Sequence, residues 1–394
     1  SGNVGIGVTP ETWHSSYDAL QIGGLASLIG VAAQSAGSST WLTNNTYIDS
    51  GGDATYIVTD EAAAYRQENG KHEFKVAASG SADATISFSN VMVLDVDSRI
   101  SLSNNGGAGN TIFGYKAGAN IAGGGNSNIL IGHEAGNDLT TADGNVAIGY
   151  QAFDQATDDC DQNVVVGNYS MGGNIASNDV SDCVALGFNV MSGVLESTAS
   201  GTVGIGSGAL VALTSGERNI AIGYEAMDAL PDGDDNIALG YQALTTASTT
   251  ATVRNIAMGS YALKSLNANC SDNIAIGHKS LENASSNDID SNIAIGSYVM
   301  DGITSQGVWG CVGIGTSVMT EAVTAAAAGS IGIGFYALTA LTSGAENVAV
   351  GFEALQDMTT GSSNVAVGYQ SQKDLNHADA DCNVTLGNYT MDGV

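Results

Sequence analysis

The chain has 394 residues, of which 40 are Asp or Glu and 10 are Lys or Arg, and its formal charge is −30. This balance argues against nucleic acid as a partner, because phosphate binding needs clustered cations, and it leaves no basic patch for an anionic membrane surface. Charged residues make up 13% and apolar residues 43% of the chain, so its composition is not that of a disordered protein.

Residues 1–104 show no sustained periodicity. Apolar and β-branched residues cluster at 54–59 and 84–96, with Gly- and Ser-rich turns between them, which predicts a small β domain. The Gly-rich stretch 104–109 is the predicted junction, so the expected domains are 1–104 and 105–394. No apolar run approaches the roughly 20 residues of a membrane span, so no membrane insertion is expected. Because the chain starts without Met and stops within a repeat, we expect a piece of a longer polypeptide.

A pentapeptide then recurs from residue 110 to the end. It consists of Asn, Ile or Val, a small residue, another aliphatic residue and Gly, as in NVAIG at 145–149 and NIAIG at 219–223. Its sixteen glycines follow one another at intervals of 17 to 20 residues. This period is too short for helical-pair repeats, and it predicts short coils that stack into a solenoid.

The pentapeptide predicts a strand, because its large residues stand two apart. A second strand is expected after the glycine, for example at 241–244, so that each coil has two strands and two turns. The predicted fold is therefore all-β: a parallel β-roll or β-solenoid of about 16 coils, roughly 75 Å long at the usual strand spacing. Its predicted core residues are Ile148, Ile222, Leu239, Ile276, Ile295, Val350 and Val367. Leu or Met stands four residues after twelve of the sixteen glycines and should fill the same core.

The middle residue of the pentapeptide predicts a nearly bare face. Small residues allow another backbone to approach closely, so we expect this face to lie at the axis of a homotrimer. The residues expected to face that axis are Ala147, Ala221, Ala238, Ala257, Ala275, Ala294, Ala349 and Ala366. The early copies instead have Ile112, Leu130 and Val165 at this position, which predicts a wider separation of the chains there.

Catalytic motifs are not evident. The sequence contains no GxSxG, HExxH, P-loop or dinucleotide-binding fingerprint, and we expect no enzyme. Five widely spaced cysteines without a CxxC pair favour free buried thiols over disulfides or zinc.

Two acidic clusters are the candidate metal ligands. They comprise Asp158, Asp159 and Asp161 in one turn and Asp232, Asp234 and Asp235 in another. Crowded carboxylates could hold Ca²⁺, with a solvated acidic turn as the alternative, and paired acids could also cleave a polysaccharide. A row of aromatic residues after the motif glycines, such as Tyr224 and Tyr241, suits either sugar binding or packing along the stack.

The repeat resembles the head repeats of trimeric autotransporter adhesins, which are left-handed parallel β-rolls. Its longer forms, NVAIGYQA at 145–152 and NIALGYQAL at 236–244, are similar to repeats in bacteriophage tail fibres, especially marine ones. Segments 2–24 and 59–74 resemble the region that precedes such repeats in phage fibres.

This resemblance implies an extracellular virion appendage for host attachment. Its partners would be other copies of itself, a host cell-surface glycan or protein, and other virion tail proteins. Two alternatives remain open, the head of a cellular trimeric adhesin and a carbohydrate-degrading tailspike.

Overall fold

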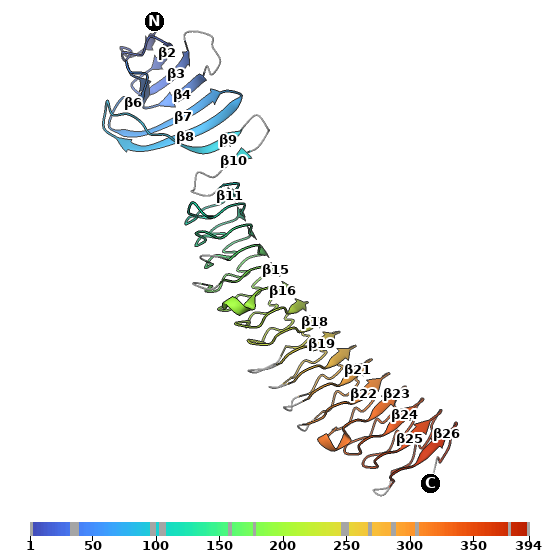
Figure 1. Ribbon diagram of the computed structural model, residues 1–394. Helices are drawn as coiled ribbons and strands as arrows, with labels where there is room; N and C mark the ends of the chain where they lie inside the picture. Colours follow the sequence, from blue (N-terminus) through green and yellow to red (C-terminus); the bar gives the residue numbers. More distant parts are fainter. Residues whose placement is uncertain are drawn as a thin grey trace. The chain divides into compact units, whose positions relative to one another are not determined.

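The computed structural model describes most of the chain (Figure 1). The described residues are 3–31, 39–94, 100–101, 108–156, 160–175, 179–245, 252–266, 270–284, 289–303, 307–376 and 380–391. They form two compact units, Ser1–Phe113 and Gly114–Val394, whereas the expected junction at 104/105 lies outside the described residues. In the described part, no helix is long and apolar enough to cross a membrane.

The first unit is built on one eight-stranded sheet. In spatial order its strands are β1 (Val4–Ile6), β2 (Tyr17–Ile22), β3 (Ala26–Val31), β4 (Ser39–Asn44), β7 (Asp60–Glu68), β8 (Lys71–Gly80), β9 (Ser89–Leu94) and β10 (Ile100–Ser101). All neighbours are antiparallel except β1 and β2. A hairpin of β5 (Thr46–Ile48) and β6 (Ala54–Tyr56) forms a second, two-stranded sheet.

The core of this unit lies on one face of the large sheet. Ile29 of β3 and Ala19 of β2 pack with Trp13 and with Ile48 of the hairpin, and all four are buried. A neighbouring cluster joins Tyr56 to residues of β7 and β8. The hairpin therefore covers one face of the sheet, where alternate residues of the central strands β2, β3, β4, β7 and β8 are buried.

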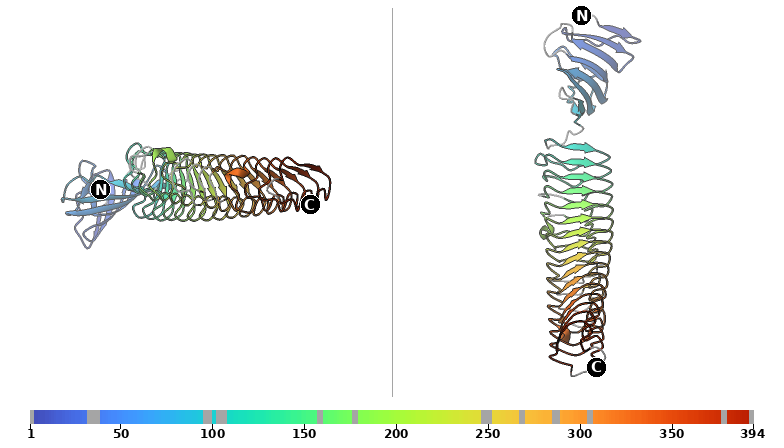
Figure 2. Two further views of the ribbon diagram at one scale, coloured as in Figure 1. Left: turned by 90° about the horizontal axis from the view of Figure 1, so that it is seen from below. Right: turned by 90° about the vertical axis from the view of Figure 1, so that its right-hand side faces the viewer.

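The second unit is a parallel β-solenoid. In the described chain it contains a sixteen-stranded sheet in strict sequence order, with one three-residue strand per coil (Figure 2). Its strands are β11 (Thr111–Phe113), β12 (Ile129–Ile131), β13 (Val146–Ile148), β14 (Val164–Val166), β15 (Val184–Leu186), β16 (Val203–Ile205), β17 (Ile220–Ile222), β18 (Ile237–Leu239), β19 (Ile256–Met258), β20 (Ile274–Ile276), β21 (Ile293–Ile295), β22 (Val312–Ile314), β23 (Ile331–Ile333), β24 (Val348–Val350), β25 (Val365–Val367) and β26 (Val384–Leu386). Two 3-10 turns, η1 (Ser197–Ala199) and η2 (Ala325–Ala327), lie outside the sheet. The predicted all-β solenoid is confirmed.

The direction of the strand side chains is the reverse of the prediction. The expected core residues, Ile148, Ile222, Leu239, Ile276, Ile295, Val350 and Val367, point outward and are half-buried or exposed. The residues expected at a trimer axis, Ala147, Ala221, Ala238, Ala257, Ala275, Ala294, Ala349 and Ala366, are fully buried inside their own coil. Both assignments are corrected: the small residue is needed because the coil is too narrow for a large side chain on the inner face of the strand.

The Leu and Met residues four places after the motif glycine do fill this interior. Met227 and Leu244 are fully buried, as are most of their equivalents. Leu130 and Val165 also point inward and are fully buried, which removes the reason for expecting a wider separation of the chains at the early copies. Gly136 takes the Leu position in the coil of Leu130, where a Cβ would lie 2.8 Å from a Leu130 methyl group. The interior volume is conserved by exchanging sizes between the two positions.

The same exchange occurs between successive coils. Three residues after the motif glycine, most coils have Ala, but one has Val190. In the next coil the middle residue of the strand is Gly204 instead of Ala, and a Cβ on Gly204 would lie 2.7 Å from Val190 Cγ1. Val299 with Gly313, and Val318 with Gly332, repeat the arrangement, at 2.5 and 2.7 Å. These contacts identify the middle strand position as part of the interior.

Each strand ends at the motif glycine because the neighbouring coil lies too close for a side chain. Gly223 has φ +144°, and a Cβ there would lie 2.2 Å from the carbonyl oxygen of Gly240 in the next coil. The second strand expected after the glycine is absent at residues 241–244: Gln242 and Leu244 have φ of 49° and 53°, so the chain turns there.

The motif asparagines form a buried ladder along the solenoid. Asn236 donates its backbone N–H and its Nδ2 to Asn219 Oδ1, at 3.0 and 3.2 Å, and Nδ2 also donates to the Thr252 carbonyl at 2.8 Å. Its own Oδ1 accepts the backbone N–H and the Nδ2 of Asn255. An amide is suited to this position because it donates and accepts at once, which satisfies polar groups that the coil buries.

Candidate interaction surface

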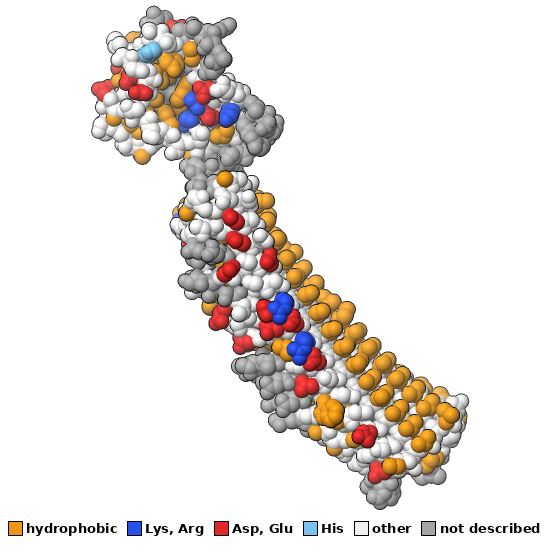
Figure 3. Space-filling view, in the orientation of Figure 1, with side chains coloured by type: hydrophobic (Ala, Val, Ile, Leu, Met, Phe, Trp, Pro, Cys, Tyr) orange, Lys and Arg blue, Asp and Glu red, His pale blue; other side chains and the backbone are white. Residues whose placement is uncertain are grey.

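The outward residues of the strands form two apolar columns. The first column contains the first residue of each strand and the second column the third residue, for example Ile220 and Ile222 of β17. The exposed fraction is 38% for Ile222 and 39% for Ile129. None of the sixteen described strands contains a charged residue. Figure 3 shows rows of hydrophobic side chains along the strand-bearing edge of the solenoid.

The size of this surface follows from strand geometry. Sixteen strands at a spacing of about 4.8 Å give a length of roughly 75 Å, and three residues give a width of about 10 Å, or about 750 Å². Soluble monomers rarely expose a contiguous apolar patch larger than a few hundred Å². The columns are therefore the main candidate for a protein–protein contact in this unit.

A ladder of aromatic rings runs beside the second column, at the first or second residue after the motif glycine. It comprises Tyr115, His133, Tyr150, Tyr169 and Phe188; Tyr224, Tyr241, Tyr261, His278 and Tyr298; and Phe335, Phe352, Tyr369 and Tyr389. Tyr224 and Tyr241 stack with centroids 5.6 Å apart and planes at 8°. Packing along the stack is confirmed. In the stacked pairs each ring covers the face of its neighbour, and a sugar ring would need that same face to be open.

The acidic residues predicted as metal ligands serve the stacking of the coils where the structure describes them. Asp161 accepts the backbone N–H of Asp143 at 2.6 Å, and Asp234 accepts the backbone N–H of Glu217 at 2.9 Å; both donors lie in the preceding coil. Asp232 accepts the hydroxyl groups of Thr214 and Ser215.

Of the remaining predicted ligands, the structure describes Asp235 alone. Asp235 pairs with Arg218 at 2.7 Å, which lowers the pKa of its carboxyl group. Asp158 and Asp159 lie outside the described residues. Among the described residues, no group of three or more His, Cys, Asp or Glu side chains is arranged to hold a metal ion.

One carboxyl group has a strongly perturbed pKa. Burial, together with the charges of Asp138 and Glu134, raises the pKa of Asp154 to about 6. Asp154 Oδ1 is buried without a hydrogen-bond partner. The perturbation therefore comes mainly from burial, to which the neighbouring carboxylates add.

The five cysteines are not joined in disulfides, in agreement with the prediction. Cys160, Cys183, Cys270 and Cys311 are buried, and Cys382 is exposed. Burial raises the pKa of Cys183 to about 11, and this thiol takes the place of a motif asparagine in the ladder. A buried, protonated thiol of this kind is a packing residue rather than a nucleophile.

The sequence analysis missed the apolar columns because it placed these side chains in the core. A signal in the sequence could have found them. When the middle residue of a strand is Gly, the preceding coil has Val three residues after its motif glycine, as with Val190 and Gly204. Such a paired change in size indicates that the two positions share one interior. Comparison of the chain with known protein families, curated proteins and solved structures gives no match.

Proposed function

We propose that this chain is a non-enzymatic, elongated fibre of a virion, a tail fibre or related appendage, that assembles as a homotrimer for host-surface attachment. The observation that carries the proposal is the uncharged apolar face that continues through all sixteen described strands. The phage and trimer assignments come from the resemblance of the repeats.

Another copy of the same chain is the partner that suits this face. Copies with a charge of −30 repel each other wherever their acidic turns meet, whereas the columns contain no charge. Their estimated area, about 750 Å² per chain, is close to the roughly 800 Å² per partner of a standard stable interface. Three copies around one axis would bury the columns and leave the acidic turns in solvent.

The mechanism of such a fibre is mechanical. Parallel strands and the asparagine ladder connect each coil to the next, which gives stiffness along the axis. Three parallel copies would present each outer surface three times, so weak contacts with a host glycan or protein would add up through multivalency. The acidic turns and the edges of the aromatic rings would remain outside for those contacts.

A pair of matched variants tests the assembly. Ile222→Asp places a charge in the second column, while Val194→Asp places the same charge at a side chain that is 57% exposed and outside the columns. We expect Ile222→Asp to reduce the trimer fraction at low concentration and Val194→Asp to leave it unchanged. Equal behaviour of the two variants would contradict the proposed interface.

The virion assignment needs a separate experiment. Gold-labelled antibodies against this chain should decorate appendages of purified virions, and labelling of a cell envelope instead would favour the cellular adhesin. Release of reducing ends from host polysaccharide by the purified chain would favour the tailspike.

A further inference from the structure

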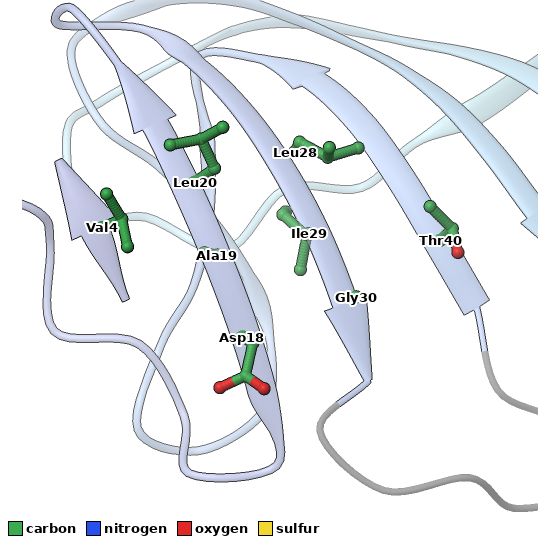
Figure 4. A pocket seen from close by; sticks show the side chains of 8 residues that line it. All are labelled: Val4, Asp18, Ala19, Leu20, Leu28, Ile29, Gly30 and Thr40. Carbon is green, nitrogen blue, oxygen red and sulfur yellow. The ribbon is translucent and has the colours of Figure 1, made fainter. Parts of the chain in front are cut away.

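The eight-stranded sheet of the first unit has a second, uncovered face. A row of seven apolar residues crosses it on directly paired positions of seven strands: Val4, Leu20, Leu28, Leu42, Tyr65, Phe74 and Met92. Figure 4 shows Val4, Leu20 and Leu28 on neighbouring strands. The exposed fraction is 52% for Val4, 57% for Leu42 and 43% for Phe74. We call this row the open face.

Shallow hollows line the open face along its length. One is lined by Val4, Leu20 and Leu28 together with the polar side chains of Asp18 and Thr40 (Figure 4). Leu42 and Phe74 line two other hollows, the first together with Val76 and the second together with Met92. Side chains of a partner could therefore insert along the whole row.

The charges of the central strands lie on the opposite, covered face. Arg66 Nε is 2.5 Å and Lys75 Nζ 3.4 Å from Glu73 Oε2, and the Arg66 guanidinium lies over the ring of Trp41 at 5.0 Å. Alternation along β7 and β8 thus sends the ion pairs to one side and Tyr65 and Phe74 to the other. The sheet presents an uncharged row to whatever covers it.

We propose that the open face packs against the open faces of other copies of this chain, as a second self-association surface besides the columns of the solenoid. The inference rests on the proposed trimer. Strand β10 ends at Ser101 and β11 begins at Thr111, so nine residues lie between the two sheets, and the ten steps from Ser101 to Thr111 span at most about 35 Å of extended chain. Copies joined along the solenoid therefore hold their first units at an effective concentration of about millimolar.

The size of the open face agrees with a contact that forms only within the assembly. Seven strands at about 4.8 Å give a row roughly 29 Å long, and a width of about 10 Å gives roughly 300 Å². This is well below the roughly 800 Å² per partner of an independent interface, but it is sufficient when the copies are already tethered. The row itself contains no charged residue, so repulsion between acidic copies is weakest along it, and Asp18 is a charged residue that lines the hollow beside Val4 and Leu20.

Cysteine cross-linking of the full chain tests this contact. The exposed Cys382 is replaced by Ser, and Leu20, Leu28, Leu42 and Phe74 are changed to Cys one at a time. Ser50→Cys is the control, because Ser50 is exposed in the turn between β5 and β6, on the side of the hairpin. Circular dichroism checks that each variant is folded, and mild oxidation followed by a non-reducing gel measures the linked fraction.

We expect at least one row variant to form disulfide-linked dimers several-fold faster than Ser50→Cys. If none does while the mass remains three chains, the inference is overturned and the proposed fibre stands. If the chain is monomeric, the inference and the proposed trimer fail together. Rapid labelling of every row cysteine by a maleimide in the trimer would likewise overturn the inference and would show that the face awaits another partner.

Discussion

The contact between Val190 and Gly204 allows a quantitative test of how the coils are packed. A methyl group added by Gly204→Ala would lie 2.7 Å from Val190 Cγ1, which is far inside van der Waals contact, and 3.4 Å from Leu210 Cδ1. Such overpacking costs about 1–3 kcal/mol, and the loss of glycine entropy in the unfolded chain offsets about 0.4–1 kcal/mol. We therefore expect a net destabilisation of about 1–2 kcal/mol.

The double variant should reverse this loss. Val190→Ala alone removes two buried methyl groups and should cost about 2 kcal/mol, including the cavity that it leaves. Together the two changes recreate the Ala–Ala pair of coils such as that of Ala226 and Ala238, both of which are fully buried. The double variant should then lie within about 1 kcal/mol of the parent, a coupling of about 2 kcal/mol or more.

Denaturant unfolding of the four proteins, followed by circular dichroism, completes the cycle. Val318 and Gly332 provide a second, independent pair with the same geometry. Additive effects at both pairs would refute the assignment of these residues to one shared interior.

Three further predictions concern single positions. Ala221→Leu should destabilise the solenoid strongly, by about 3 kcal/mol or more, because the fully buried site leaves no room for a larger side chain, whereas Ile222→Ser should leave the fold intact. Melting curves of the two variants measure this difference. A larger loss of stability for Ile222→Ser than for Ala221→Leu would restore the original core assignment. Asn236→Ala should cost about 2–4 kcal/mol, since it leaves several buried partners without a hydrogen bond, and Asn236→Ser should cost less; denaturant midpoints measure both. Asp154→Asn should raise the denaturant midpoint at pH 8 and have a smaller effect at pH 4, and a pH-independent change would contradict the raised pKa.

The sign of this last effect follows from linkage. The folded-state pKa of Asp154, about 6, lies above the ordinary value of 3.8, so the folded protein binds the proton more tightly than the unfolded chain. The favourable contribution is complete below about pH 4 and is lost as the pH rises through about 6. Removal of the charge therefore helps most at high pH.

The repeat predicted the positions of the strands well, but alternation within a strand cannot say which face is inside. The outward positions, such as Ile220 and Ile222, are apolar because they form a surface of their own, so hydrophobicity pointed to the wrong face. Size was the better indicator: the inner position admits Leu130 only where Gly136 supplies the space.

The turns were harder to predict for a different reason. Left-handed backbone is uncommon for residues with a side chain, yet Gln242 and Leu244 both adopt it. Gly208 stands at the same position in its coil as Gln242 with φ +72°, and Gly136 stands at the position of Leu244 with φ +56°, so these glycines are local signals of that conformation. The acidic turns could not be assigned from the sequence, because carboxylates that accept backbone N–H groups from the preceding coil, as Asp161 and Asp234 do, have the same sequence pattern as metal ligands.

The most direct test of the proposed fibre is the mass of the purified chain in solution, measured by light scattering over a range of concentrations. The account predicts a particle of three times the 39.6 kDa mass of one chain, and the same mass in EDTA, because apolar columns rather than metal ions hold the copies together. A stable monomer with its apolar columns in solvent would contradict it.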